Sequence, residues 1–190
     1  MTTPDALGYA FALSLSPAED LRMRAWAEAM PGATWDPTGG HVTLARFTGS
    51  LPPEALVPAV REACAGVQPI PARFTLPARG PYWDKPGVEI VMLVSERPED
   101  IAGVLDLRER LLAAVLPLGL PLLEGGSYRP HVTLTTGLPA EDASRLEAAA
   151  RDLDLRFTSH EVVYWCGGET VDPDVSPDPP WRIVERVVLL

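Results

Sequence analysis

His41-Val42-Thr43-Leu44 is repeated without change as His131-Val132-Thr133-Leu134. The two copies stand about half the chain length apart, and their histidines are two of only 3 in the 190 residues. A motif that recurs at half length indicates an internally duplicated fold with one copy in each half. We therefore expect residues 1–190 to form a single duplicated domain whose two lobes are interleaved.

Each copy of the motif has the residue types of a β-strand, because neighbouring Val, Thr and Leu favour extended backbone. Alternate side chains of a strand point to the same face. His41 and Thr43 therefore share one face, as do His131 and Thr133, and the Val and Leu side chains point to a core. If a pseudo-twofold axis relates the halves, the two polar faces meet across a cleft.

The rest of the chain mixes strands and helices without regular alternation, which predicts an α+β protein. We expect two pseudo-symmetric lobes of antiparallel sheet that line a central cleft, with the helices outside. Further strands are predicted over residues 9–15, 72–76, 89–95, 153–157, 161–166 and 182–190, and helices over 18–30, 53–65, 99–116 and 140–151. Residues 78–87 are predicted to be a loop.

Composition narrows the class of protein. The net charge is −10, which argues against a long nucleic-acid footprint, since that requires a basic face. The sequence has no apolar run long enough to span a bilayer and no signal-peptide pattern, so we expect a cytoplasmic protein. Two cysteines, Cys64 and Cys166, are too few for a disulfide framework and are expected to be free thiols.

Two facing imidazoles suit an in-line displacement at phosphorus, which needs a base on the entering oxygen and an acid on the leaving oxygen. Histidine fills both roles near neutral pH. The hydroxyls of Thr43 and Thr133 can donate hydrogen bonds to the non-bridging phosphate oxygens. This chemistry needs no metal and no cofactor, and it predicts a bell-shaped dependence of rate on pH.

The paired motifs resemble the His-x-Thr-x signatures of the two-histidine phosphoesterases. Within that group the chain is most similar to the 2′-5′ RNA ligase family, also called RNA 2′,3′-cyclic phosphodiesterases. The matching stretches are residues 9–17, 41–49 and 128–134, with 181–190 similar in character. The resemblance implies opening of a 2′,3′-cyclic phosphate to a 2′-phosphate, with His41 as the acid and His131 as the base. It also implies the reverse reaction, in which two RNA ends are joined through a 2′-5′ linkage.

Besides the two threonines, Phe11 and Arg129 are candidate substrate-binding residues. Phe11 lies on the first predicted strand, which the resemblance places beside the active site, although a role in the core is equally compatible with its position. Arg129 stands two residues before His131 and so shares its strand face. Arg46 has the opposite parity to His41 and would reach the phosphate only if a bulge intervened.

Two aromatic residues and the third histidine lie outside the repeated motif. Tyr164 and Trp165 are candidates for stacking on a nucleobase, with burial in the core as the alternative. His160 lacks the motif around it and is interpreted as a surface or structural residue.

The expected substrate is an RNA end or a small cyclic nucleotide, and the sequence leaves its size open. We expect a monomer without an obligate protein partner and without membrane association. Two alternatives remain. In the first, His41 and His131 are metal ligands, which would require a further carboxylate or imidazole in the cleft. In the second, the protein binds a nucleotide without turning it over.

Overall fold

The structure is a computed structural model that describes residues 7–36, 38–82, 86–123, 128–168 and 180–190. Its main feature is an antiparallel sheet of seven strands in the order β4-β5-β6-β2-β1-β8-β9, with a separate pair β3-β7. The strands are β1 (Leu7–Ser14), β2 (His41–Gly49), β3 (Ile70–Phe74), β4 (Leu76–Pro81), β5 (Val88–Val94), β6 (His131–Pro139), β7 (Leu155–Ser159), β8 (Glu161–Gly168) and β9 (Arg182–Val188). The predicted α+β class is confirmed.

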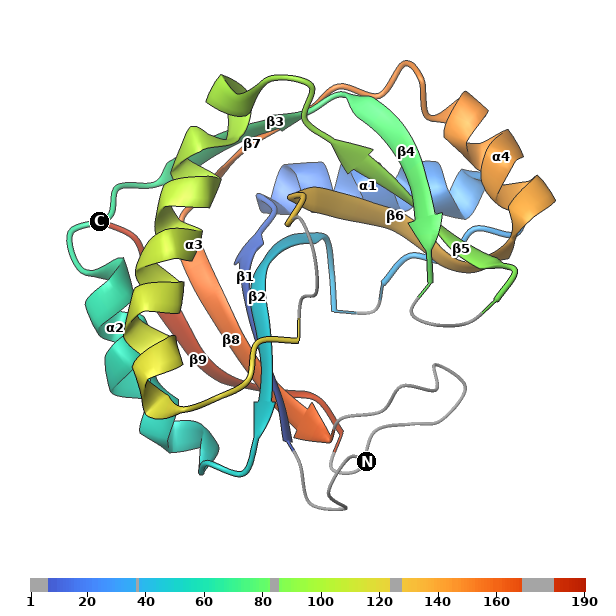
Figure 1. Ribbon diagram of the computed structural model, residues 1–190. Coiled ribbons are helices and arrows are strands. Elements are labelled where there is room, and N and C mark those ends of the chain that lie inside the picture. Colours follow the sequence, from blue (N-terminus) through green and yellow to red (C-terminus); the bar gives the residue numbers. More distant parts are fainter. Residues whose placement is uncertain (1–6, 37, 83–85, 124–127, 169–179) are drawn as a thin grey trace.

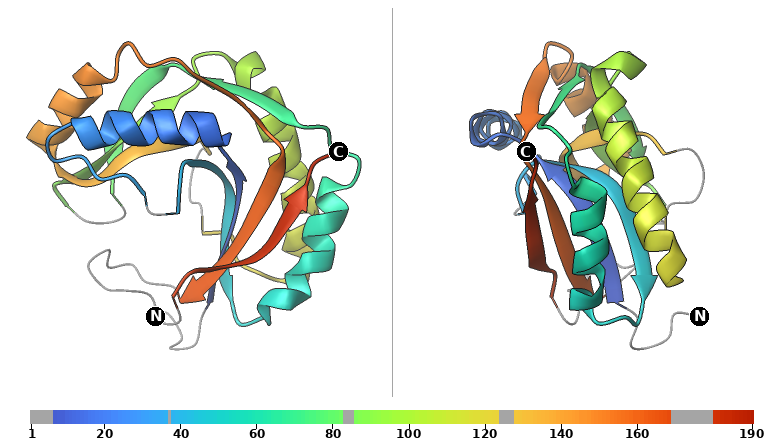
Figure 2. Two further views of the ribbon diagram at one scale, coloured as in Figure 1. Left: turned by 180° about the vertical axis from the view of Figure 1, so that it is seen from behind. Right: turned by 90° about the vertical axis from the view of Figure 1, so that its left-hand side faces the viewer.

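The helices lie outside the curved sheet, as expected (Figures 1 and 2). They are α1 (Pro17–Ala29), α2 (Val57–Cys64), α3 (Ala102–Val115) and α4 (Ala140–Ala149), with short 3-10 turns η1 (Pro53–Leu56), η2 (Pro98–Ile101) and η3 (Leu116–Leu118). α2 and α3 cover the half that contains β1, β2, β8 and β9, and α1 and α4 cover the other half. None of the described helices is both long enough and apolar enough to cross a membrane.

The two halves of the molecule meet in one continuous sheet. β4, β5 and β6 form one half, and β2, β1, β8 and β9 form the other. They join where β2 pairs antiparallel with β6 at Val42 and Val132. Each half carries one copy of the repeated motif, and both copies begin a strand.

The two motif strands are irregular at the same place. In the pairing of β1 with β2, Ala12 faces Thr43 and Phe11 faces Ala45, so Leu44 is left over. In the pairing of β5 with β6, Met92 faces Thr133 and Val91 faces Thr135, so Leu134 is left over. Each strand therefore carries a β-bulge directly after its His-Val-Thr sequence, which reverses the face of the residues that follow it, Arg46 in β2 and Thr136 in β6. The pairing of β5 with β6 shifts once more between Glu89 and Val91.

Phe11 lies in the hydrophobic core and not at the cleft. Its side chain is 0 % exposed, and its ring centroid lies 5.9 Å from that of Phe47 and 4.8 Å from that of Tyr164. A side chain with no accessible surface cannot touch a ligand, so the structure places Phe11 outside the substrate-binding set. Tyr164 is also fully buried, and its hydroxyl donates to the Pro53 carbonyl at 3.0 Å.

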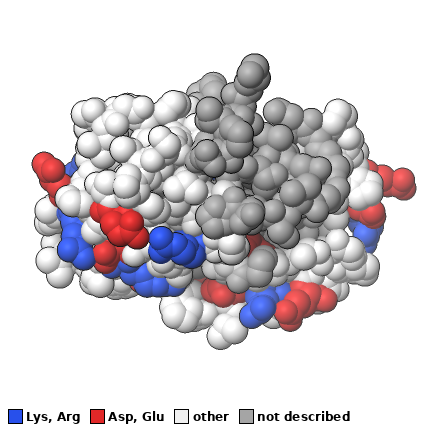
Figure 3. Space-filling view, turned by 90° about the horizontal axis from the view of Figure 1, so that it is seen from below, with Lys and Arg blue, Asp and Glu red and all other residues white. Residues whose placement is uncertain are grey.

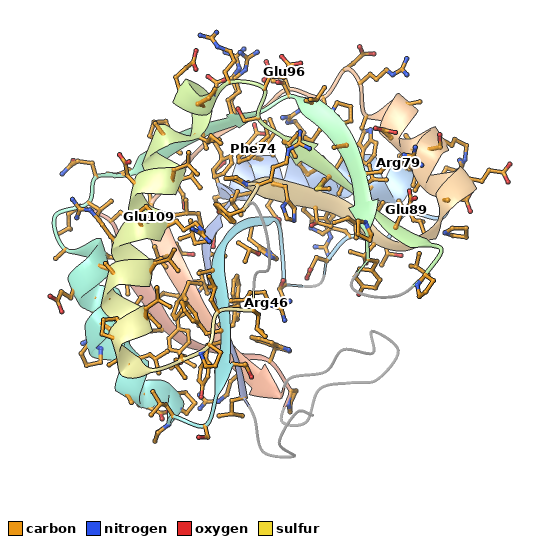
Figure 4. The ribbon with its side chains drawn as sticks, in the orientation of Figure 1. Arg46, Phe74, Arg79, Glu89, Glu96 and Glu109 are labelled. Atoms are coloured by element: carbon orange, nitrogen blue, oxygen red, sulfur yellow. The ribbon has the colours of Figure 1, made fainter. Side chains whose placement is uncertain are left out.

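The prediction of a loop over residues 78–87 is wrong for its first four residues, which belong to β4. Strand propensity is low here because the segment contains Pro77, Gly80 and Pro81. Proline is tolerated on an edge strand, and β4 is an edge of the sheet. Figure 4 shows Arg79 of β4 close to Glu89 of β5, and the two form an ion pair of 3.1 Å.

Both cysteines are free, as the sequence predicted, and the structure shows that both are buried. Burial raises the pKa of the Cys64 thiol to about 11. The thiol is therefore protonated and unreactive near neutral pH.

The burial of Phe11 predicts that Phe11→Ala lowers the free energy of unfolding by about 3–5 kcal/mol, since it leaves a cavity between two aromatic rings. Urea denaturation measures this change. Leu21→Ala is the control, because Leu21 is 63 % exposed and its loss should cost less than about 0.5 kcal/mol. Equal, small effects of the two substitutions would contradict the placement of Phe11 in the core.

Candidate active site

The Val42–Val132 pair fixes the arrangement of the two motifs. Both valines are fully buried on one face of the sheet. An antiparallel register set at Val42 and Val132 places His41 across from Thr133 and Thr43 across from His131. These four side chains are half-buried and point to the other face, because neighbours along a strand alternate. The two histidines and two threonines therefore lie on one face of the sheet.

The two histidines are diagonal neighbours in this array. Side chains that are directly opposite in an antiparallel pair have Cβ atoms about 5 Å apart, and diagonal neighbours are about 7–8 Å apart. His41 and His131 take one diagonal, and Thr43 and Thr133 take the other. A tetrahedral phosphate held over the centre would have one imidazole on each of two opposite sides.

Both imidazoles are held by the same local contact. His41 Nδ1 lies 2.9 Å from the Gly39 carbonyl oxygen, and His131 Nδ1 lies 2.9 Å from the Arg129 carbonyl oxygen. A carbonyl oxygen can only accept, so Nδ1 carries the hydrogen in both rings. Nε2 is therefore the nitrogen left to take or give a proton, and the geometry gives the two histidines the same tautomer.

The turn before His41 requires its two glycines. Gly39 has φ +85°, a conformation that favours glycine. A Cβ on Gly40 would lie 2.4 Å from the Leu15 side chain. The Gly40 N–H donates to an Asp20 carboxylate oxygen at 2.5 Å, which fixes the turn on α1. These contacts position the carbonyl that orients His41.

The segment before His131 is tied to the first motif. The Tyr128 hydroxyl donates to the Thr43 carbonyl at 2.7 Å, and the Arg108 guanidinium lies 4.0 Å from the centroid of the Tyr128 ring. Arg129 is exposed, and the contact that it makes to the site is its carbonyl bond to His131. A role of its side chain in binding substrate stays a prediction.

Arg46 lies on the same face as His41 and Thr43, because the bulge at Leu44 and Ala45 restores its parity. It lies partway along β2 (Figure 4). The condition under which Arg46 was expected to reach the site is thus met. At the equivalent position after the second bulge the chain has Thr136, so the two halves differ here in charge.

A pocket of about 310 Å³ opens beside His41. Arg46, Ala10 and Trp165 stand side by side on three neighbouring strands, and the small Ala10 leaves room between the two large side chains. The ring centroid of Trp165 lies 5.3 Å from that of His41. The full lining is Ala10, Asp36, Thr38, His41, Thr43, Arg46, Trp165 and Trp181.

Of the aromatic pair proposed for stacking, the structure keeps Trp165 at the site and places Tyr164 in the core. Trp181 and Asp36 were not foreseen. The spacing of Trp165 and Gly167 was the available signal for Trp181, since a glycine on the same strand face admits a neighbouring ring. His160 is exposed and lies between β7 and β8, as the interpretation of it as a surface residue predicted.

Among the described residues, no group of three or more His, Cys, Asp or Glu side chains is arranged to hold a metal ion. Over the described atoms of the face in Figure 3, acidic and basic side chains are interspersed and do not gather into a basic expanse.

Comparison with known proteins identifies the family. The structure is similar to the crystal structure of E. coli LigT in apo form, with a TM-score of 0.60 and 16% identity, covering 97% of this chain and 98% of LigT. For TT0787 of Thermus thermophilus the TM-score is 0.61 and the identity 19%, covering 96% and 97% of the two chains. For Kluyveromyces marxianus Usb1 the values are 0.51 and 12%, covering 98% and 99%.

These likenesses show the fold, and a search of curated proteins gives no significant match. The family model of the 2′-5′ RNA ligase superfamily matches residues 16–167, which include both motifs. The chain therefore belongs to the 2′-5′ RNA ligase superfamily of two-histidine phosphoesterases.

Proposed function

We propose that this protein opens 2′,3′-cyclic phosphates, at an RNA end or on a nucleotide, and leaves a 2′-phosphate. The observation that carries the proposal is the diagonal placement of His41 and His131 on one sheet face, with Nδ1 of each bound to a carbonyl. In the proposed reaction the Nε2 atoms of both rings therefore act on one phosphate, one as the base and the other as the acid. Solved structures of E. coli LigT with 3′-AMP and with phosphate support a nucleotide ligand for this fold.

The reaction begins when a water oxygen bonds to phosphorus and His131 Nε2 takes a proton from that water. The bond between phosphorus and O3′ breaks, and protonated His41 gives its Nε2 proton to O3′. One water is consumed, and the product is a 2′-phosphomonoester with a free 3′-hydroxyl. The assignment of acid and base follows the family pattern. A 5′-hydroxyl in place of water would form a 2′-5′ linkage through the same step.

Thr43 and Thr133 occupy the second diagonal of the array and donate hydrogen bonds to the two non-bridging oxygens. Arg46 adds a positive charge at the edge of the array on the His41 side. Neither histidine requires a metal for these roles, so we propose metal-independent hydrolysis.

Hydrolysis of a 2′,3′-cyclic mononucleotide in the presence of a chelator tests this proposal. We expect a 2′-phosphate product by phosphorus NMR, and a loss of about 10²–10⁴-fold in kcat for His41→Ala or His131→Ala. His160→Ala should keep the full rate, because His160 is an exposed histidine outside the array. Nucleotide binding without turnover, unaffected by either histidine substitution, would instead indicate a binding protein. Dependence on added metal would reject the mechanism.

The acid can be told from the base with a cyclic substrate in which sulfur replaces O3′. A thiolate leaves without being protonated, so His41→Ala should recover most of its lost rate on this substrate. His131→Ala should stay slow, because water still needs a base. The ratio of kcat/KM for the sulfur and oxygen substrates measures the recovery. Recovery by the His131 variant instead would reverse the assignment.

The bulge predicts unequal roles for Arg46 and Thr136, which occupy equivalent positions in the two halves. Arg46→Ala should lower kcat/KM by roughly 10–100-fold, because a hydrogen bond to a charged group contributes about 1.5–3 kcal/mol. Thr136→Ala is the matched control and should change kcat/KM by less than about fivefold. Similar effects at the two positions would argue against a charge role for Arg46.

A further inference from the structure

The pocket beside His41 has one wall of indole rings. Trp165 lies on β8, and Trp181 lies just before β9. An ideal Cβ on Gly167 would lie 2.7 Å from the Trp181 Cα and 2.7 Å from its ring. Trp181 therefore packs directly on the backbone of β8, in a space that only glycine leaves open. Its ring also lies 5.9 Å from the guanidinium carbon of Arg46.

The rings are close to the groups that would hold the phosphate. Trp165 is next to His41, and Trp181 is next to Arg46. Aromatic rings bind the faces of nucleobases, and this contact is tolerant of base identity. The pocket volume, about 310 Å³, is at the lower end of the range for small-molecule sites and suits one nucleotide.

Asp36 adds a charged acceptor to the same pocket. One of its carboxylate oxygens, Oδ1, accepts from the Thr38 N–H at 2.8 Å and from the Thr38 hydroxyl at 2.5 Å. Within the described part of the chain the other oxygen, Oδ2, accepts no hydrogen bond and keeps two lone pairs. A carboxylate repels a phosphate, so the phosphate belongs at the Thr43 and Arg46 end of the pocket and Asp36 serves the base.

We infer that this pocket holds the base of the nucleotide against Trp165 and Trp181, and that Asp36 makes it selective for guanine. The inference rests on the proposed function, because it assumes a nucleotide phosphate over the histidine array. It also places the nucleoside, and hence the leaving O3′, on the His41 side.

Guanine is favoured because its Watson–Crick edge carries two adjacent N–H donors, at N1 and N2. One carboxylate oxygen with two lone pairs can accept both. Adenine and cytosine place an unprotonated ring nitrogen beside their amino group, and uracil flanks its single N–H with two carbonyl oxygens. In these bases an acceptor atom would face the carboxylate oxygen, and two acceptors repel each other. Hydrogen bonds to a charged group are stronger than neutral ones, so the discrimination is expected to be large.

Asp36→Asn is the sharpest variant, because an asparagine Oδ1 can keep both bonds from Thr38 while Nδ2 replaces the free acceptor with a donor. Calorimetry with 2′-GMP and 2′-AMP should show at least a tenfold preference for 2′-GMP in the natural chain. The preference should fall to about unity or reverse in Asp36→Asn. Asp152 is an exposed aspartate that follows α4 and does not line the pocket. Asp152→Asn should therefore leave the preference for 2′-GMP unchanged.

Trp165→Ala separates stacking from edge recognition. It should weaken the binding of both nucleotides by roughly 5–100-fold and leave their ratio unchanged.

Equal affinity of the natural chain for 2′-GMP and 2′-AMP would overturn the inference, as would a guanine preference that survives Asp36→Asn. These results are distinguishable from failure of the proposed function. In that case no cyclic phosphate, with or without a base, would be hydrolysed, while the binding preference could still be measured.

Discussion

The site depends on one backbone register, the antiparallel pairing of Val42 with Val132. A slip of one residue would turn the histidines and threonines of one strand into the core and its valine and leucine to solvent. The burial of both valines opposes that slip. Two hydrogen bonds across the halves support the same register. The Tyr128 hydroxyl donates to the Thr43 carbonyl, and the Thr34 N–H donates to the buried Thr135 hydroxyl at 2.8 Å.

The two halves share the residues to which we assign the phosphate chemistry and differ in the residues around them. Both histidines have the same tautomer-fixing carbonyl two residues earlier, and both strands have a bulge after the threonine. After the bulge the first half presents Arg46 and the second presents Thr136. The two histidines are placed symmetrically, but Arg46 and Thr136 beside them differ. In the proposed mechanism this difference allows one histidine to act as the acid and the other as the base, although their side chains are identical.

Much of this architecture could be predicted from the repeat alone. An identical tetrapeptide with strand propensity predicts two strands, a shared polar face and a duplicated site, because side-chain alternation is a local property. The bulges could not be predicted, since they arise from pairing with β1 and β5, and they decide the face of Arg46. The sequence also left open whether Phe11 faces the core or the cleft. Strand alternation shows which residues share a face with Phe11, but it does not show which face of the sheet helices α2 and α3 cover.

The sequence did not predict the edge strand β4, because strand propensity is low for Pro77 and Pro81. In a sheet, however, proline is unfavourable only where the backbone N–H must bond to a neighbouring strand, and an edge strand has positions where it need not. Trp181 and Asp36 line the pocket together with His41 and Trp165. The sequence shows that Gly167 leaves room for a neighbouring ring, but which ring fills that room, and that Asp36 meets β8, depend on the packing of segments that are distant in sequence.

A crystal structure of the protein with a guanosine 2′,3′-cyclic vanadate would show whether both histidines act on one phosphorus, because vanadate adopts the five-coordinate geometry of the transition state. We expect vanadium over the centre of the array, with one apical oxygen within hydrogen-bond distance of His41 Nε2 and the other within hydrogen-bond distance of His131 Nε2. Vanadium bound to one histidine alone, or away from both, would contradict it.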